Sequence, residues 1–143
     1  MDPDKSYAIR QAIKALLEAV AAIQATVYDT NTTPLDSGEL PIINIFTLND
    51  AEATQSRAYH PVHNRLKTGE VEIHVVLHAD TTELSKKISI LKKQVQDTIL
   101  ASRSLDGVVT AIDYDSTQYD YSGVRTELPH VMAVMKFNVE FKE

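Results

Sequence analysis

Residues 131–141 constrain the fold more than any other part of the chain, because strongly apolar side chains recur at every second position. The odd-numbered positions of this segment are Val131, Ala133, Met135, Phe137, Val139 and Phe141. The positions between them include Lys136, Asn138 and Glu140. A period of two places alternate side chains on one face of a β-strand. We therefore predict a strand whose odd-numbered face packs on a hydrophobic core.

Two other segments show the 3.6-residue periodicity of amphipathic helices. The first spans residues 3–25, where Pro3 suits the first helical position after an Asp2 cap. Its apolar stripe consists of Ile9, Ile13, Leu16, Val20 and Ile23. The second helix follows Asp80, which we expect to act as the cap with Glu83 as its capping-box partner. Its apolar stripe consists of Leu84, Ile88, Leu91, Val95 and Ile99.

Further strands are predicted at residues 26–29, at 42–46 after Pro41, at 71–77 after a Thr68-Gly69 turn, and from Val108 after an Asp106-Gly107 turn. A polar connection spans residues 49–67. Connections of this length in compact domains are usually functional or mobile, and we predict that it is mobile in a free subunit and becomes ordered on assembly.

The order of helix, strands, helix, strands predicts an α+β fold, with a mainly antiparallel sheet and two helices packed on one face. The length of 143 residues predicts a single domain over residues 1–143.

Composition excludes several kinds of function. The formal net charge of −6 opposes a general attraction to nucleic acid. There are no cysteines, so disulfides and thiolate chemistry are excluded. The four glycines are spread along the chain, whereas a phosphate-binding loop needs them clustered. Neither a secretory signal nor an apolar run long enough to span a bilayer is recognised, so we expect a soluble, cytoplasmic product.

Candidate chemical groups are few, and no catalytic, cofactor-binding or metal-binding site is predicted. His74 and His78 lie four apart on one predicted strand, about 13 Å along it at ~3.3 Å per residue, which is too far for one metal ion. Asp113 and Asp115 are expected to share one face of a strand. Paired carboxylates can act as general acid and base, but a solvated strand edge explains them equally well.

Two features indicate protein contacts. The long connection contains a basic patch made of Arg57, Arg65 and Lys67, with Tyr59, His60 and His63. It fits a solvated loop, a contact with an acidic protein surface or, less well given the net charge, nucleic acid. Ile90 lies off the apolar stripe of the second helix, among lysines. It is either a subunit contact or a lone exposed apolar residue.

Most of the chain resembles, in order and pattern, the tail terminator proteins of long-tailed bacteriophages, of the minor tail protein U type. The resemblance begins with Arg10 and Leu16-Leu17 in the first helix and the strand Glu39-Leu40-Pro41-Ile42-Ile43-Asn44-Ile45-Phe46. It continues with Glu70-Val71-Glu72-Ile73-His74-Val75 and the helix from Thr82. It ends with Leu105-Asp106-Gly107-Val108-Val109, Asp113-Tyr114-Asp115 and the alternating last strand.

The resemblance implies a ring of identical subunits, most simply six, that caps the head-proximal end of the tail tube in the virion and is assembled in the host cytoplasm. Its implied partners are other copies of the chain, the tail tube protein and a head-completion protein, with no membrane. DNA would pass through the lumen without specific binding, which the acidic net charge favours. We predict the subunit or tube interface at Arg57, Tyr59, Arg65, Lys67, Ile90, Asp113, Asp115, Tyr119 and Tyr121.

Other functions stay open. A head–tail connector or neck completion protein of similar fold is the nearest alternative. A small α+β hydrolase or isomerase using Asp113, Asp115 or His74 is a different class, and it alone predicts turnover. A regulatory or toxin-type module that binds one partner is a third, and it predicts a monomer or dimer.

Overall fold

The computed structural model describes residues 4–32, 40–52, 66–79, 82–125 and 127–142. The elements in chain order are α1 (Lys5–Glu18), β1 (Thr26–Asp29), β2 (Ile42–Glu52), β3 (Leu66–His78), α2 (Leu84–Leu100), β4 (Ala111–Asp120), the 3₁₀ helix η4 (Ser122–Arg125) and β5 (His130–Lys142). No helix within these ranges is long and apolar enough to cross a membrane.

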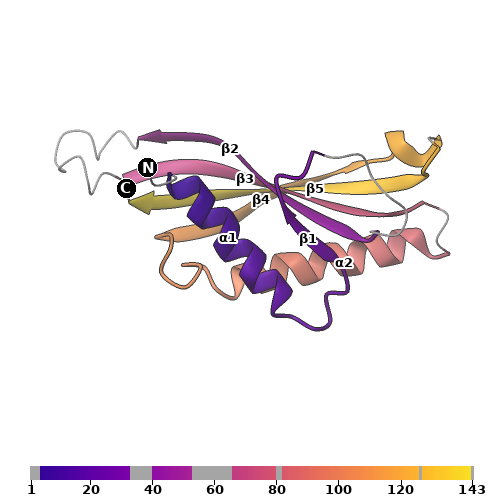
Figure 1. Ribbon diagram of the computed structural model, residues 1–143, viewed down its shortest axis with the longest axis horizontal. Coiled ribbons are helices and arrows are strands. Elements are labelled where there is room, and N and C mark those ends of the chain that lie inside the picture. The colour runs from indigo at the N-terminus through magenta and orange to yellow at the C-terminus, as the bar shows by residue number, and fades with distance from the viewer. Residues whose placement is uncertain (1–3, 33–39, 53–65, 80–81, 126, 143) are drawn as a thin grey trace.

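The strands form one twisted sheet in the order β1-β2-β3-β5-β4. β1 runs parallel to β2, and every other pair is antiparallel. Both helices lie on the same face of the sheet (Figure 1). α1 contacts β1 and β2, whereas α2 contacts β3, β4 and β5. The predicted α+β fold, with a mainly antiparallel sheet and two helices on one face, is confirmed.

The last strand is central to the core, as its alternating pattern predicts. β5 pairs with β3 along its whole length, from His130 opposite His78 to Lys142 opposite Leu66. The six apolar side chains at its odd positions from 131 to 141 are each at most 2% exposed. They face the helices, so the period of two identified the buried face correctly.

The first helix is shorter than predicted and begins at a different cap. Asp4, not Asp2, caps α1, and its carboxylate accepts a hydrogen bond from the Ser6 N–H at 3.1 Å. The helix ends at Glu18, where the chain reverses to bring Thr26 beside Ile42. Ile23 is still buried, because it packs on the same core from the turn that follows the helix.

The buried stripe of α1 also differs from the predicted one. It consists of Ile9, Ile13 and Leu17, whereas Leu16 is only partly buried. Consecutive residues lie about 100° apart around a helix, so either Leu16 or Leu17 can face the core, and the position of β1 and β2 beneath α1 selects Leu17.

The second helix confirms the predicted core stripe but not the predicted cap. Ile88, Leu91, Val95 and Ile99 are buried, and Leu84 packs against them. Glu83 is itself the capping residue, with a positive φ of 58° and no side-chain cap hydrogen bond. It therefore stands outside the helix and cannot be the third helical residue of a capping box. Asp80 lies outside the described residues.

The central hairpin extends further than its polar sequence indicates. β2 continues to Glu52 and β3 begins at Leu66, so the predicted turn at Thr68-Gly69 is wrong. Gly69 pairs with Asp50 of β2 on one side and with Val139 of β5 on the other. A glycine weakens an isolated strand, but here the strands on both sides hold it in place. The connection is thus residues 53–65, which lie outside the described part of the chain.

The turn before β4 is present, but the strand starts three residues later than predicted, at Ala111. Leu105, Asp106 and Gly107 all have positive φ, at 49°, 56° and 88°. Left-handed backbone at Gly107 carries little steric cost, and Leu105, fully buried, anchors the turn to the core.

Candidate functional site

The groups considered for catalysis are dispersed. Within the described residues no three His, Asp or Glu side chains are close enough to hold a metal ion. His74 lies on the sheet face opposite the helices, with its Nε2 atom 2.6 Å from Oε1 of Glu72 and its ring centroid 4.8 Å from that of Phe46. His78 lies at the end of β3, opposite His130.

The two aspartates of β4 do not form a carboxylate pair of the expected kind. Asp113 is exposed and forms an ion pair with Arg103 from the turn after α2. The ladder steps from Tyr114 opposite Phe137 to Ser116 opposite Lys136, so Asp115 is the extra residue of a β-bulge. Asp113 and Asp115 are both exposed and alternate with the buried Ile112 and the partly buried Tyr114, in agreement with their expected place on one face, and the bulge interrupts the period of two only from Asp115 onward.

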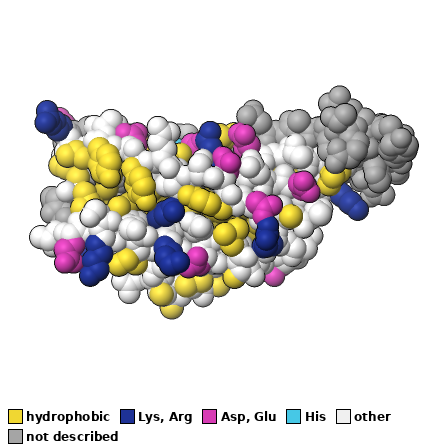
Figure 2. Space-filling model, turned by 180° about the vertical axis from the view of Figure 1, so that it is seen from behind, with side chains coloured by type: hydrophobic (Ala, Val, Ile, Leu, Met, Phe, Trp, Pro, Cys, Tyr) yellow, Lys and Arg dark blue, Asp and Glu magenta, His cyan; other side chains and the backbone are white. Residues whose placement is uncertain are grey.

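Exposed apolar side chains gather where β4 ends and η4 begins. Tyr119 is 40% exposed, Tyr121 56% and Val124 39%; we call these three residues the aromatic end. Figure 2 shows apolar side chains at the left end of the molecule, with Lys and Arg side chains beside them. Ile90, on α2, is 48% exposed. The sequence placed Tyr119, Tyr121 and Ile90 at an interface, and all three side chains are available for one.

The aromatic end is held in place by its neighbours. A β-carbon on Gly123 would overlap the ring of His130, so only glycine lets η4 lie this close to β5. The Ser122 N–H donates to Oδ1 of Asp120 at 2.8 Å. That backbone hydrogen bond is the main reason that the pKa of Asp120 lies below its usual value. Tyr121 therefore projects from a fixed turn.

A cavity of about 220 Å³ opens at the other end of the molecule, between the start of α1 and the sheet. Its walls are apolar and acidic, and they come from α1, β2, β3 and β5. The lining residues are Asp4, Ser6, Ile9, Thr47, Leu48, Gly69, Glu70, Val139 and Phe141. Because Gly69 has no side chain, it adds no bulk to the wall. Leu48 is 42% exposed.

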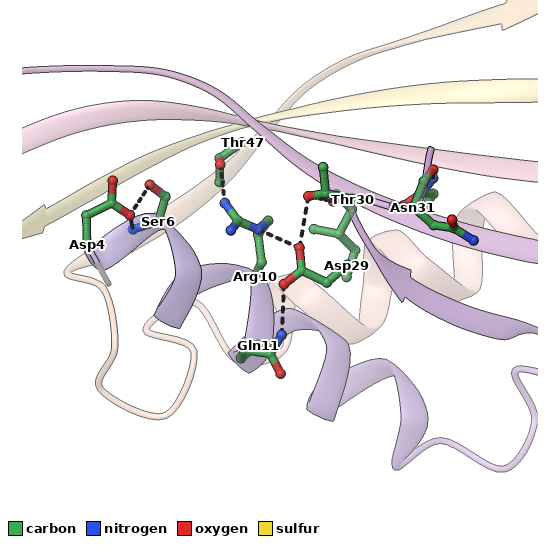
Figure 3. Close-up of polar contacts among 10 residues, drawn as sticks. Asp4, Ser6, Arg10, Gln11, Asp29, Thr30, Asn31 and Thr47 are labelled. Atoms are coloured by element: carbon green, nitrogen blue, oxygen red, sulfur yellow. Dashed lines mark hydrogen bonds and ion pairs between the residues drawn. The ribbon is translucent and has the colours of Figure 1, made fainter. Parts of the chain in front are cut away.

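A polar network fixes the α1 wall of this cavity against the sheet (Figure 3). The Arg10 guanidinium donates through Nε to Oδ1 of Asp29 at 2.6 Å and through Nη1 to Oγ1 of Thr47 at 2.6 Å. Gln11 donates to Oδ2 of Asp29 at 2.8 Å, and Thr30 donates to Oδ1 at 2.9 Å.

The network keeps Asp29 charged. Burial alone would raise the pKa of Asp29, but the hydrogen bonds from Thr30, Gln11 and Arg10, with the charge of Arg10, lower it below its usual value. The side chains of Arg10 and Asp29 are only 19% and 17% exposed, so this is a largely buried ion pair that joins α1 to β1 and β2.

The predicted basic patch is only partly within the described residues. Arg57, Tyr59 and Arg65 lie outside them. Lys67 lies on β3, opposite Phe141 and Glu52, and is partly buried. Lys67 therefore belongs to a strand and not to the connection of residues 49–67 in which the sequence analysis placed it.

Sequence reasoning missed both the cavity and the network. The cavity depends on four elements that are distant in sequence, and no local pattern indicates it. Arg10 and Asp29 offered one signal, since each is a charged residue within or beside a segment predicted to be buried, and such residues are usually paired.

Comparison with known proteins gives one family. The model of a family described as phage minor tail protein U matches residues 4–141, a range that includes almost every residue of the sheet and both helices. No curated protein matches the chain significantly.

Solved structures share the fold. A chain of a structure titled "Virion of native gene transfer agent (GTA) particle" is 12% identical, with a TM-score of 0.66, and the match covers 99% of this chain and 100% of that one. A second is 16% identical, with a TM-score of 0.53 and coverage of 99% and 97%. At these identities the likeness concerns the fold alone.

Proposed function

Since the chain belongs to the phage minor tail protein U family, whose members are structural tail proteins, we propose that it forms a ring of identical subunits that caps a phage tail tube and ends its polymerisation. The match over residues 4–141 carries this proposal, because it includes the whole core and both ends of the sheet. The gene transfer agent virion chain of similar fold supports a place in a particle of the same kind.

A ring explains termination through its symmetry. A contact between two different surfaces of identical subunits either closes into a ring or grows without limit. A closed ring leaves no free subunit surface within its own plane, so it can cover the end of a tube without extending it. Six subunits are the expected number, and the free face of the ring would dock the head-completion protein.

The subunit contact is proposed to include the aromatic end and α2. Tyr119 and Tyr121 are large and half-exposed, and aromatic residues are enriched at interfaces because they bury much area at low entropic cost. Ile90 adds apolar surface beside the exposed Lys93. Asp113 pairs with Arg103 at the surface. At a subunit contact this pair would fix how the two subunits align more than how tightly they bind.

The basic residues Arg57, Arg65 and Lys67, with the aromatic Tyr59, are proposed to contact an acidic surface of a neighbouring subunit or of the tube. DNA would pass through the lumen without specific binding, because a chain of net charge −6 does not retain phosphates. The proposed location is the head-proximal end of the tail in the virion, after assembly in the host cytoplasm. We infer no catalytic role.

Sedimentation velocity over a wide concentration range, with negative-stain images of the same samples, tests the ring. Incubation with purified tail tubes then tests capping: tubes mixed with the protein should stop growing when tube protein is added. A protein that stays monomeric and does not bind tubes would refute the proposal. Binding to filled heads without binding to tubes would instead indicate a neck completion protein.

A further inference from the structure

We propose that Tyr121 of one subunit inserts into the cavity at the α1 end of the next subunit, so that this cavity is the acceptor of the ring contact. The inference rests on the proposed function, because it needs a contact between different surfaces of identical chains. It specifies which surface meets the aromatic end.

Tyr121 suits the role of an inserted anchor. It is the most exposed of the large apolar side chains within the described residues, at 56%. It follows β4 directly and precedes η4, whose close approach to β5 depends on Gly123. A side chain that projects from a rigid turn loses little freedom on binding, and this favours affinity.

The cavity has the size and chemistry to receive a phenol. Its volume is about 220 Å³, and a cavity of roughly 150 Å³ already holds benzene. Leu48, 42% exposed, offers apolar surface to the ring, and Ile9, Val139 and Phe141, each at most 2% exposed, form the closed floor of the cavity. Asp4 and Glu70 also line it, and a carboxylate accepts a strong hydrogen bond from a phenolic hydroxyl.

The two surfaces lie at opposite ends of the long axis (Figure 1). The cavity is beside the starts of α1 and β3, whereas η4 stands at the far end of the sheet. A subunit therefore cannot insert Tyr121 into its own cavity. The contact must join two copies head to tail, which is the geometry that closes rings.

One pair of opposite charges can form across this contact, between Arg125 and the carboxylates of the cavity. Arg125 is exposed on η4, close in sequence to Tyr121, and the cavity lining contains the carboxylates of Asp4 and Glu70. Asp120, also at the aromatic end, already accepts a hydrogen bond from Ser122, and Glu127 is exposed there. Arg125 is thus the group at this end that would complement the acidic mouth of the cavity.

Paired cross-linking tests the contact directly, since the natural chain has no cysteines. Chains carrying Tyr121→Cys are mixed with chains carrying Leu48→Cys, and the mixture is assembled and treated with a short bismaleimide. We expect efficient cross-links between the two kinds of chain. Mixing Tyr121→Cys with Ser102→Cys, on the turn after α2, is the matched control and should give few.

Substitutions at both surfaces supply a second measurement. Tyr121→Ala and Leu48→Arg should each raise the concentration for half-maximal assembly by about tenfold or more, as expected for a central anchor. Tyr121→Phe and Leu48→Met, the matched controls, should change it only a few-fold. Combining Arg125→Glu with Glu70→Arg should restore part of the assembly that either substitution alone removes.

The outcomes separate this inference from the function beneath it. Rings that form normally with Tyr121→Ala, and that show no cross-link above the control, would overturn the inference and leave the ring intact. Normal rings that no longer cap tubes when Leu48→Arg is present would also overturn it, by assigning the cavity to the tube. The absence of rings and of capping in the natural protein would refute the proposed function itself.

Discussion

Replacing Asp29 by Ala should destabilise the subunit strongly, because the carboxylate is the centre of the network that joins α1 to the sheet. Asp29 accepts three hydrogen bonds, from Arg10, Gln11 and Thr30. Hydrogen bonds to charged groups contribute about 1.5–3 kcal/mol, and removing one partner of a fully buried pair costs roughly 3–5 kcal/mol. Arg10 and Asp29 are 19% and 17% exposed, so some solvent compensates.

We therefore expect the free energy of unfolding to fall by about 2–3 kcal/mol in Asp29→Ala. For a chain of this size that lowers the Tm by roughly 6–12 °C. The measurement is urea unfolding followed by circular dichroism, at a concentration low enough to keep the protein monomeric, because assembly would add to the apparent stability.

The matched control removes an ion pair at the surface of the same helix. Nζ of Lys14 lies 3.6 Å from Oε1 of Glu18, whose side chain is 52% exposed. Exposed ion pairs four residues apart on a helix contribute only about 0.3–0.5 kcal/mol to the free energy of unfolding. Glu18→Ala should thus be nearly silent. If Asp29→Ala lost no more stability than Glu18→Ala, the network would not be what fixes α1 to the sheet.

Acid provides an independent check on the same group. The pKa of Asp29 is lower in the folded chain than in the unfolded one. The stability that its charge contributes is therefore present above the unfolded pKa and is lost as the pH falls through the folded value. Asp29→Asn should reduce the loss of stability below about pH 4 relative to the natural chain.

Other predictions concern the core, the turn and the dispersed polar groups. Phe137→Ala, at a fully buried position, should cost about 3–5 kcal/mol in urea unfolding, and a cost under 1 kcal/mol would contradict its central place in the core. Gly123→Ala should displace η4 from His130 and shift the amide NMR signals of the aromatic end, whereas an unchanged spectrum would show that η4 has room. His74→Ala and Asp113→Asn should leave the fold and ring assembly nearly intact, and loss of a measurable turnover in either folded variant would favour an enzyme.

The sequence predicted the fold best in elements that have one apolar face and one more polar face. In residues 131–141 the period of two identifies each buried side chain correctly. The α2 stripe from Ile88 to Ile99 was predicted equally well. These patterns succeed because a single register places all the apolar groups on the core, and a shift by one residue would expose them.

The sequence failed where neighbouring elements decide the local structure. Gly69 resembles a turn residue, yet strands on both sides hold it within β3. Asp115 is exposed, as the alternation of β4 predicts, but the bulge at this residue was not predicted. Neither Gly69 nor Asp115 carries a local signal of these contacts, since propensity describes a segment in isolation and pairing is decided by distant strands.

The network and the cavity are physically linked, and this link determines which variants are informative about assembly. Ser6 and Ile9 of the cavity wall belong to α1, the helix that Arg10 fixes to Asp29 and Thr47. A variant that frees α1 would alter the cavity as well as the fold, so poor assembly of Asp29→Ala would not locate the subunit contact. Leu48 is half-exposed, and its apolar side chain has no atom that could take part in the hydrogen bonds of the network. Loss of assembly in Leu48→Arg, with the stability unchanged, is therefore the result that identifies the cavity as a contact surface.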